Sequence, residues 1–221
     1  YDIPRKRENR TFGLNYYYFF RVMENLSGTI NNFDDYKEVF KRLVEFYKRV
    51  DKKSIGKGLR GPTKKLETYM RFIGSSGDLV ESVGDLDKIL NSLERLSEKE
   101  KGYESHFEPW AIPGNGRNEN LRDYFENIDS FVWYIDSMAN CVEHEKFNSK
   151  VFNYVMSKYM KLAKEKEDFT KIANVFLDIV FELKNLYKDC YSIEYKLTDM
   201  LSCFNPVIGS VDELIEGKDS L

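Results

Sequence analysis

Residues 32–50 read NFDDYKEVFKRLVEFYKRV, and this stretch decides the fold class. Its apolar residues recur every three or four positions, which places them along one face of an α-helix. The expected inward face consists of Tyr36, Val39, Phe40, Leu43, Tyr47 and Val50. Asn32 and Asp34 stand where the helix begins, and side chains of this type cap helix N-termini. The spacing predicts a helix that ends at about Val50 and turns this face into the core.

Helical spacing of apolar residues continues along most of the chain, and no window shows the alternation that is typical of a strand. Further helices are expected at 15–27, 62–73, 78–101 and 120–145. One more is expected to begin at Asn148 or Ser149 and another at Asp168 or Thr170. A last helix is expected to run through 193–201, followed by a short turn at 210–216. The sequence predicts an all-α protein, an irregular helical bundle of about seven or eight helices. No segment of about 30–45 residues repeats in the sequence, which argues against a helical-repeat solenoid.

The longest irregular stretch is 102–118, which contains Pro109, Pro113 and three glycines. Clusters of proline and glycine interrupt helices, so this linker loop is the expected boundary between two parts of the fold. We expect an N-terminal helical half at 1–101 and a C-terminal helical half at 119–221, packed against each other.

Charge is divided unevenly along the chain, although the whole sequence has 34 basic and 37 acidic residues. Residues 1–71 carry 17 basic and 9 acidic side chains, a net charge of +8, and residues 72–221 carry 17 and 28, a net charge of −11. Residues 41–71, called the basic segment below, hold 11 basic and 3 acidic side chains, which accounts for all of the +8. The first half is therefore expected to be basic and the second acidic.

Within the basic segment, a loop with Gly56, Gly58 and Gly61 leads to Pro62, a residue that favours the first turn of a helix. Free backbone N–H groups and the helix dipole favour an anion at such an N-terminus. The predicted anion-binding residues are Lys52, Lys53, Lys57, Arg60, Lys64, Lys65 and Arg71. The loop is not a P-loop, because Pro62 occupies the position of the essential lysine and no strand precedes it.

The basic segment makes a non-catalytic helical binding module the leading hypothesis, with an anionic partner, nucleic acid first, held by 41–71. The alternative is a protein–protein interaction subunit or adaptor, whose basic and acidic faces pair with a partner protein or by self-association. The helix expected at 15–27, which contains five consecutive aromatic residues at 16–20, is then an interface element. A third hypothesis is an enzyme whose site the sequence does not identify. The basic side chains can also pair with acidic residues of their own chain.

Motifs for metal binding or catalysis are not evident in the sequence. Cys141, Cys190 and Cys203 are widely spaced and lie beside apolar residues, so we expect small buried side chains instead of disulfides or zinc ligands. His106 and His144 belong to no nucleophile–base grouping. The sequence therefore predicts neither a metal site nor a cofactor, and no motif identifies a family.

The longest apolar run, at 16–20, is far too short to cross a membrane, so no membrane span is expected. No signal-peptide pattern is visible, and the cysteine usage suits a reducing compartment. We therefore expect an intracellular, cytoplasmic protein. Four alanines stand against 23 lysines and 16 asparagines, a bias that is typical of an AT-rich genome and indicates a microbial or viral source.

Overall fold

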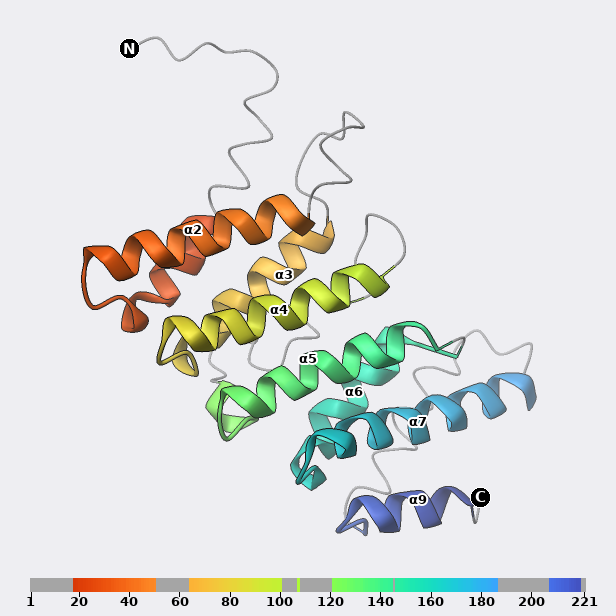
Figure 1. Ribbon diagram of the computed structural model, residues 1–221. Helices are drawn as coiled ribbons and strands as arrows, with labels where there is room; N and C mark the ends of the chain where they lie inside the picture. The colour runs from red at the N-terminus through yellow and green to blue at the C-terminus, as the bar shows by residue number, and fades with distance from the viewer. Residues whose placement is uncertain are drawn as a thin grey trace, which may run out of the picture. The chain divides into compact units, whose positions relative to one another are not determined.

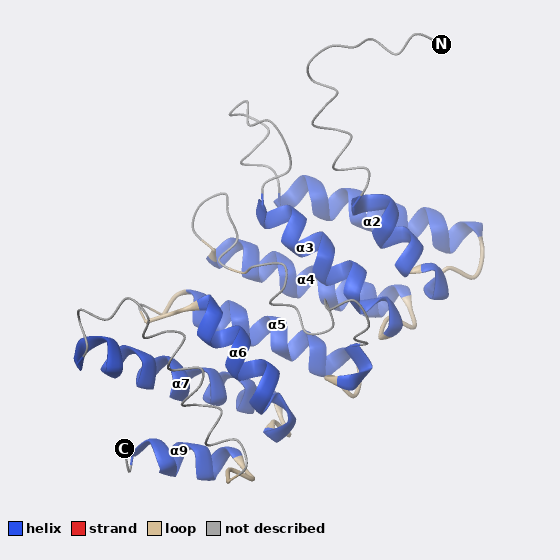
Figure 2. Ribbon diagram, turned by 180° about the vertical axis from the view of Figure 1, so that it is seen from behind, coloured by secondary structure: helices blue, strands red, loops and turns tan. Residues whose placement is uncertain are grey.

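The computed structural model describes residues 18–50, 64–100, 107, 121–144, 146–186 and 207–219 (Figure 1). Helices dominate these residues, and none of them forms a strand, as the view from behind also shows (Figure 2). The predicted all-α helical bundle is therefore confirmed. The chain divides into two compact units, Tyr1–Ile128 and Asp129–Leu221. The linker expected at 102–118, apart from Phe107, and the helix expected through 193–201 lie outside the described residues.

The first unit contains the same order of elements twice: a helix, one turn of 3-10 helix, and a longer helix. Its elements are a helix at 18–25, η1 (Ser27–Thr29), α2 (Phe33–Val50), α3 (Lys64–Ser75), η2 (Ser76–Asp78), α4 (Val83–Lys99) and η4 (Leu121–Asp123). Helices α2 and α3 both pack against α4 (Figures 1 and 2). The short turns also meet, since η1 packs against η2 and η2 against η4. Corresponding parts of successive copies are thus neighbours, as in helical-repeat proteins.

The second unit contains the same order of elements once more. Its elements are α5 (Ile128–Val142, whose first residue closes the first unit), α6 (Ser149–Tyr159), η5 (Met160–Leu162), α7 (Lys166–Leu186) and α9 (Val211–Asp219). Helix α6, turn η5 and helix α7 repeat the arrangement, and α9 packs against α7. The order of elements therefore recurs in the described residues, although no segment of the sequence repeats.

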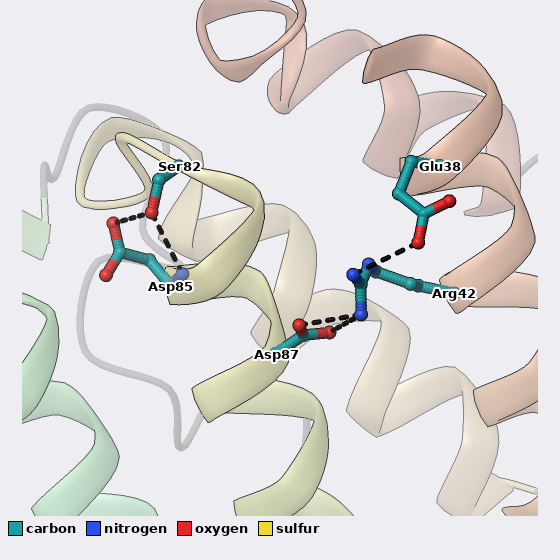
Figure 3. Close-up of polar contacts among 5 residues, drawn as sticks. All are labelled: Glu38, Arg42, Ser82, Asp85 and Asp87. Atoms are coloured by element: carbon teal, nitrogen blue, oxygen red, sulfur yellow. Dashed lines mark hydrogen bonds and ion pairs between the residues drawn. The ribbon is translucent and has the colours of Figure 1, made fainter. Parts of the chain in front are cut away.

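Four helices carry an acidic residue at their third position. These residues are Asp35 in α2, Asp85 in α4, Asp168 in α7 and Glu213 in α9. In α2, α7 and α9 the carboxylate accepts a hydrogen bond of 2.7–3.1 Å from a backbone N–H group that precedes the helix. In α4 it accepts the Ser82 hydroxyl at 2.9 Å, which in turn accepts the Asp85 N–H at 3.2 Å (Figure 3). Such caps contribute about 1 kcal/mol each and fix the residue at which a helix starts.

Two of the helices start later than expected from the sequence. The helix expected at 78–101 begins at Val83, after η2, and the one expected at 120–145 begins at Ile128, after η4. The η4 turn occupies residues that were counted as the first turn of the later helix, whereas η2 ends at Asp78 and is followed by four non-helical residues before Val83. The helix α2, by contrast, ends at Val50 as expected, although it begins at Phe33, before Asp34.

Gly77 lets the first two copies approach each other closely at η1 and η2. A Cβ atom at this position would lie 2.3 Å from the backbone oxygen of Asn25, a distance that real Cβ atoms do not show. Gly28 occupies the same place in η1, and a Cβ atom there would meet no atom within 4 Å. The two glycines therefore share a local structure and differ in the packing around them.

We expect Gly77→Ala to lower the free energy of unfolding by about 1–3 kcal/mol, because the methyl group forces the backbone at Asn25 away. Gly28→Ala is the matched control and should leave stability unchanged or raise it by about 0.5 kcal/mol, because it restricts only the unfolded chain. Urea denaturation followed by circular dichroism measures both variants. Equal effects of the two substitutions would contradict the close packing of η1 on η2.

Asp178 of α7 connects three segments of the second unit. Its carboxylate accepts hydrogen bonds from Lys146, which precedes α6, at 3.1 Å and from Lys218 of α9 at 2.7 Å. Burial raises the pKa of this carboxyl group, but the two lysine ammonium groups outweigh burial and hold the pKa below its ordinary value. The ion pairs therefore stabilise the unit at neutral pH, and their contribution is lost as the pH falls through the folded-state pKa of Asp178.

We expect Asp178→Asn to lower the free energy of unfolding by about 1 kcal/mol at pH 7. The difference from wild type should shrink below about pH 4, where Asp178 of the unfolded chain becomes protonated, and vanish below the lower pKa of the folded state. Urea denaturation at several pH values measures this difference, with Glu182→Gln, an exposed carboxylate of the same helix, as the control. A difference that stays constant from pH 7 to pH 3 would show that the charge of Asp178 contributes nothing.

Candidate binding surface on helix α2

Only part of the predicted anion-binding site can be placed. Four of its residues lie outside the described part of the chain, namely Lys52, Lys53, Lys57 and Arg60. Lys64 is the first residue of α3, and its side chain is not described. For these five residues, anion binding stays a prediction. Lys65 and Arg71, both in α3, are described with their surroundings.

Lys65 is buried and binds the C-terminal end of α4. Its ammonium group donates to the carbonyl oxygens of Ser97 and Glu100 at 3.2 and 3.1 Å, and it lies 3.7 Å from the Glu100 carboxylate. The Tyr69 hydroxyl donates a further hydrogen bond to that carboxylate. Burial and then the charge of Glu100 raise the pKa of Tyr69 well above its ordinary value. Lys65 thus satisfies carbonyl groups at the end of α4 and has a structural role there.

Arg71 also has partners within the first unit. Its guanidinium group donates to the Glu67 carboxylate at 2.9 Å and to the Tyr18 hydroxyl at 3.2 Å, and it lies 5.5 Å from the centre of the Tyr18 ring. Tyr18 in turn donates to Glu67 at 2.6 Å. These contacts connect the helix at 18–25 to α3, so Arg71 contributes to the packing of the first copy on the second.

The arginine side chains of α2 face acidic residues of α4. Arg42 contacts both carboxylate oxygens of Asp87 at 2.6 Å and the Glu38 carboxylate at 3.0 Å (Figure 3). Seven residues later, Arg49 lies 2.8 Å from Glu94. Each of these partly exposed pairs contributes about 0.5 kcal/mol. Lys65 pairs with Glu100 as described above. In the described part of the chain, acidic residues outside the basic segment therefore form ion pairs with three of its eight surplus positive charges.

Five aromatic side chains gather on the helix at 18–25 and on α2, and we call them the aromatic surface. They are Phe19, Phe20, Phe33, Tyr36 and Phe40. Phe33 is 72% exposed and Phe20 is 60% exposed, while Tyr36 and Phe40 are 40% and 41% exposed. Large apolar side chains that gather on a surface in this way are typical of a binding site.

The rings of the aromatic surface contact one another in an unbroken chain. Phe33 stacks on Tyr36 and Tyr36 on Phe40, with 6.2 Å between ring centres in both pairs. Phe40 meets Phe19 edge to face at 5.0 Å, and Phe19 meets Phe20 in the same way at 6.3 Å. Such pairs contribute about 0.5–1.5 kcal/mol each beyond the apolar area that they bury. The five rings therefore form a single preassembled patch.

The expectation that Tyr36 and Phe40 lie in the core is wrong. These residues occupy the fourth and eighth positions of α2, whose buried residues are instead Val39, Leu43 and Phe46. The fourth and eighth positions of α4 and α7 are all buried, and they hold Leu86, Leu90, Phe169 and Ala173. Helix α2 therefore exposes a face that its counterparts bury.

Lysine residues flank the aromatic surface on α2. Lys37, Lys41 and Lys48 are exposed, and the Lys37 ammonium group lies 4.9 Å from the centre of the Phe33 ring. Lys37 also pairs with Asp34 at 2.5 Å. Within the described part of the chain, neither Lys41 nor Lys48 forms an ion pair. The rim of the aromatic surface is therefore basic on this side.

Reactive residues elsewhere do not converge on a second site within the described ranges. No cluster of three or more His, Cys, Asp or Glu side chains that could hold a metal occurs there. Cys141 is buried with its thiol 3.8 Å from the amide oxygen of Asn174, and the His144 ring accepts the Lys146 N–H. None of the helices in these ranges is long and apolar enough to cross a membrane.

No family model, curated protein or solved structure matches the chain. Phe20 belongs to the five aromatic residues that the alternative hypothesis made an interface element, whereas Phe33 belongs to the candidate site although sequence reasoning did not select it. The signal was present, because Phe33, Tyr36 and Phe40 form a second apolar row on α2, beside the row that faces the core.

Proposed function

We propose that the chain is a non-catalytic helical binding module that holds a partner protein through the aromatic surface. The observation that carries the proposal is the exposure of contacting aromatic rings on a helix face that α4 and α7 bury. Aromatic side chains often dominate the binding energy of protein interfaces, because they offer a large contact area and lose little conformational entropy. The rim lysines would guide the partner into register, as charges at the edge of an interface do.

A second candidate function is the binding of an anionic partner, with nucleic acid first, through the basic segment 41–71. Lys41 and Lys48 support it, because both are exposed and neither pairs with a described acidic residue. Arg42, Arg49 and Lys65 count against it, because their charges are met by acidic residues of the first unit. We therefore place this function second.

Photo-crosslinking from the aromatic surface tests the proposal. A benzoylphenylalanine replaces Phe33, the most exposed ring of the surface, and in a control protein it replaces Leu186 of α7, which is 75% exposed. After irradiation in the cells in which the protein acts, we expect discrete protein adducts from position 33. The same adducts should be absent when the benzoylphenylalanine is at position 186.

The identity of the adducts decides between the candidates. Adducts with nucleic acid alone would support the second candidate. The same adducts from both positions would contradict the proposed binding surface, because they would reflect general exposure of the chain.

A further inference from the structure

We infer that the aromatic surface binds an amphipathic helix of a partner protein, and that acidic residues seven positions apart border the apolar face of that helix. This inference rests on the proposed function and specifies the chemistry of the partner. It is carried by the burial of the counterpart positions, by the basic rim, and by the way in which α2 already pairs with α4.

A helix fits the aromatic surface, because the counterpart positions are buried in helix packing. Leu86 and Leu90 of α4 are at most 2% exposed, in a helix that packs against α2 and α3. Side chains four positions apart form a ridge that enters the groove between turns of a neighbouring helix. Tyr36 and Phe40 have this spacing, and Phe33 extends the row by one turn. Helix α2 therefore offers a ridge of three rings to a partner helix.

The charges beside the aromatic surface indicate which charged residues the partner helix carries next to its apolar face. On its other side, α2 places Arg42 and Arg49, seven residues apart, against acidic residues of α4 that are also seven apart. Lys41 and Lys48 each precede one of these arginines, so they lie about 100° around the helix axis, towards the aromatic surface. Both lysines are exposed. A partner helix with carboxylates at the same seven-residue spacing can meet both of them.

The rim argues against the two other occupants of such a surface. A second copy of the chain would bring its own Lys37, Lys41 and Lys48 towards these lysines, and like charges oppose the contact. A nucleic-acid strand would meet the exposed carboxylate of Asp34 beside the lysines, which opposes its phosphates. A protein helix can carry its carboxylates only opposite Lys41 and Lys48, away from Asp34, and so avoids both conflicts.

Two synthetic peptides of about 21 residues test the inference with the full chain. Both are helix-stabilised and share one leucine face, and they differ only at two flanking positions seven apart, which hold glutamate in one peptide and lysine in the other. Fluorescence anisotropy at low salt measures their affinities. We expect the glutamate peptide to bind about tenfold more tightly, because two attractive pairs become two repulsive ones in the lysine peptide. The difference should decrease as salt is added.

Matched variants assign the binding to this surface. Lys41→Glu with Lys48→Glu should reverse the preference, while Lys158→Glu with Lys161→Glu, exposed lysines of the second unit, should leave it unchanged. Phe20→Ser with Phe33→Ser should weaken both peptides about tenfold or more. The urea unfolding midpoint of this last variant should fall modestly, because two ring contacts are lost, and its unfolding should remain a single cooperative transition.

Several results would overturn the inference. These are equal affinity for the two peptides, a preference that survives the Lys41 and Lys48 reversal, and no binding of either peptide below about 1 mM. Single-stranded oligonucleotide binding that the Phe20 and Phe33 substitutions abolish would assign the surface to nucleic acid. A dimer that these substitutions dissociate would assign it to a second copy. Protein adducts at position 33 without a peptide preference would keep the binding module and reject the acidic helix.

Discussion

A carboxylate at the third residue of α2, α4, α7 and α9 is the constraint on which the rest of the structure depends. By accepting a hydrogen bond from a residue that precedes the helix, it sets where that helix begins. In α2, α4 and α7 the helix start follows a turn of 3-10 helix. There the carboxylate also fixes the length of the connection between the longer helix and the short helix before it. With the starts fixed, residues at the same position of successive helices are comparable, and the pattern of burial can be compared between copies.

A comparison of residues at the same positions shows how one face of α2 differs from the same face of α4 and α7. The fourth and eighth residues are buried in α4 and α7, whereas in α2 they are Tyr36 and Phe40, which are exposed. The charges of α2 are divided in a similar way. Its arginines form ion pairs with α4, and guanidinium groups suit such paired contacts, while the lysines that border the aromatic surface face solvent. One side of α2 thus packs within the first unit, and the side with Phe33, Tyr36 and Phe40 is exposed.

Helical spacing was sufficient to predict the all-α class and the C-terminal end of α2, because apolar residues recur at the helical period. It misplaced the starts of α4 and α5, because Leu79 and Phe125 in the preceding turns are buried and continue that period. It also placed Tyr36 in the core, since periodicity identifies a row of side chains but not the neighbour that covers it. Charge counting placed Lys65 in an anion site, although its partners are carbonyl groups more than 30 positions away in the sequence.

Hydroxyl-radical footprinting of the whole chain, read at single residues by mass spectrometry, tests the central claim most directly. We expect rapid oxidation of Phe33 and Tyr36 in the folded protein. We expect protection of Phe46, in the neighbouring row of the same helix that faces the core, and of Tyr69, since both are fully buried. Oxidation of Phe33 and Tyr36 as slow as that of Phe46 and Tyr69 would contradict the account, because the aromatic surface would then be covered by the chain itself.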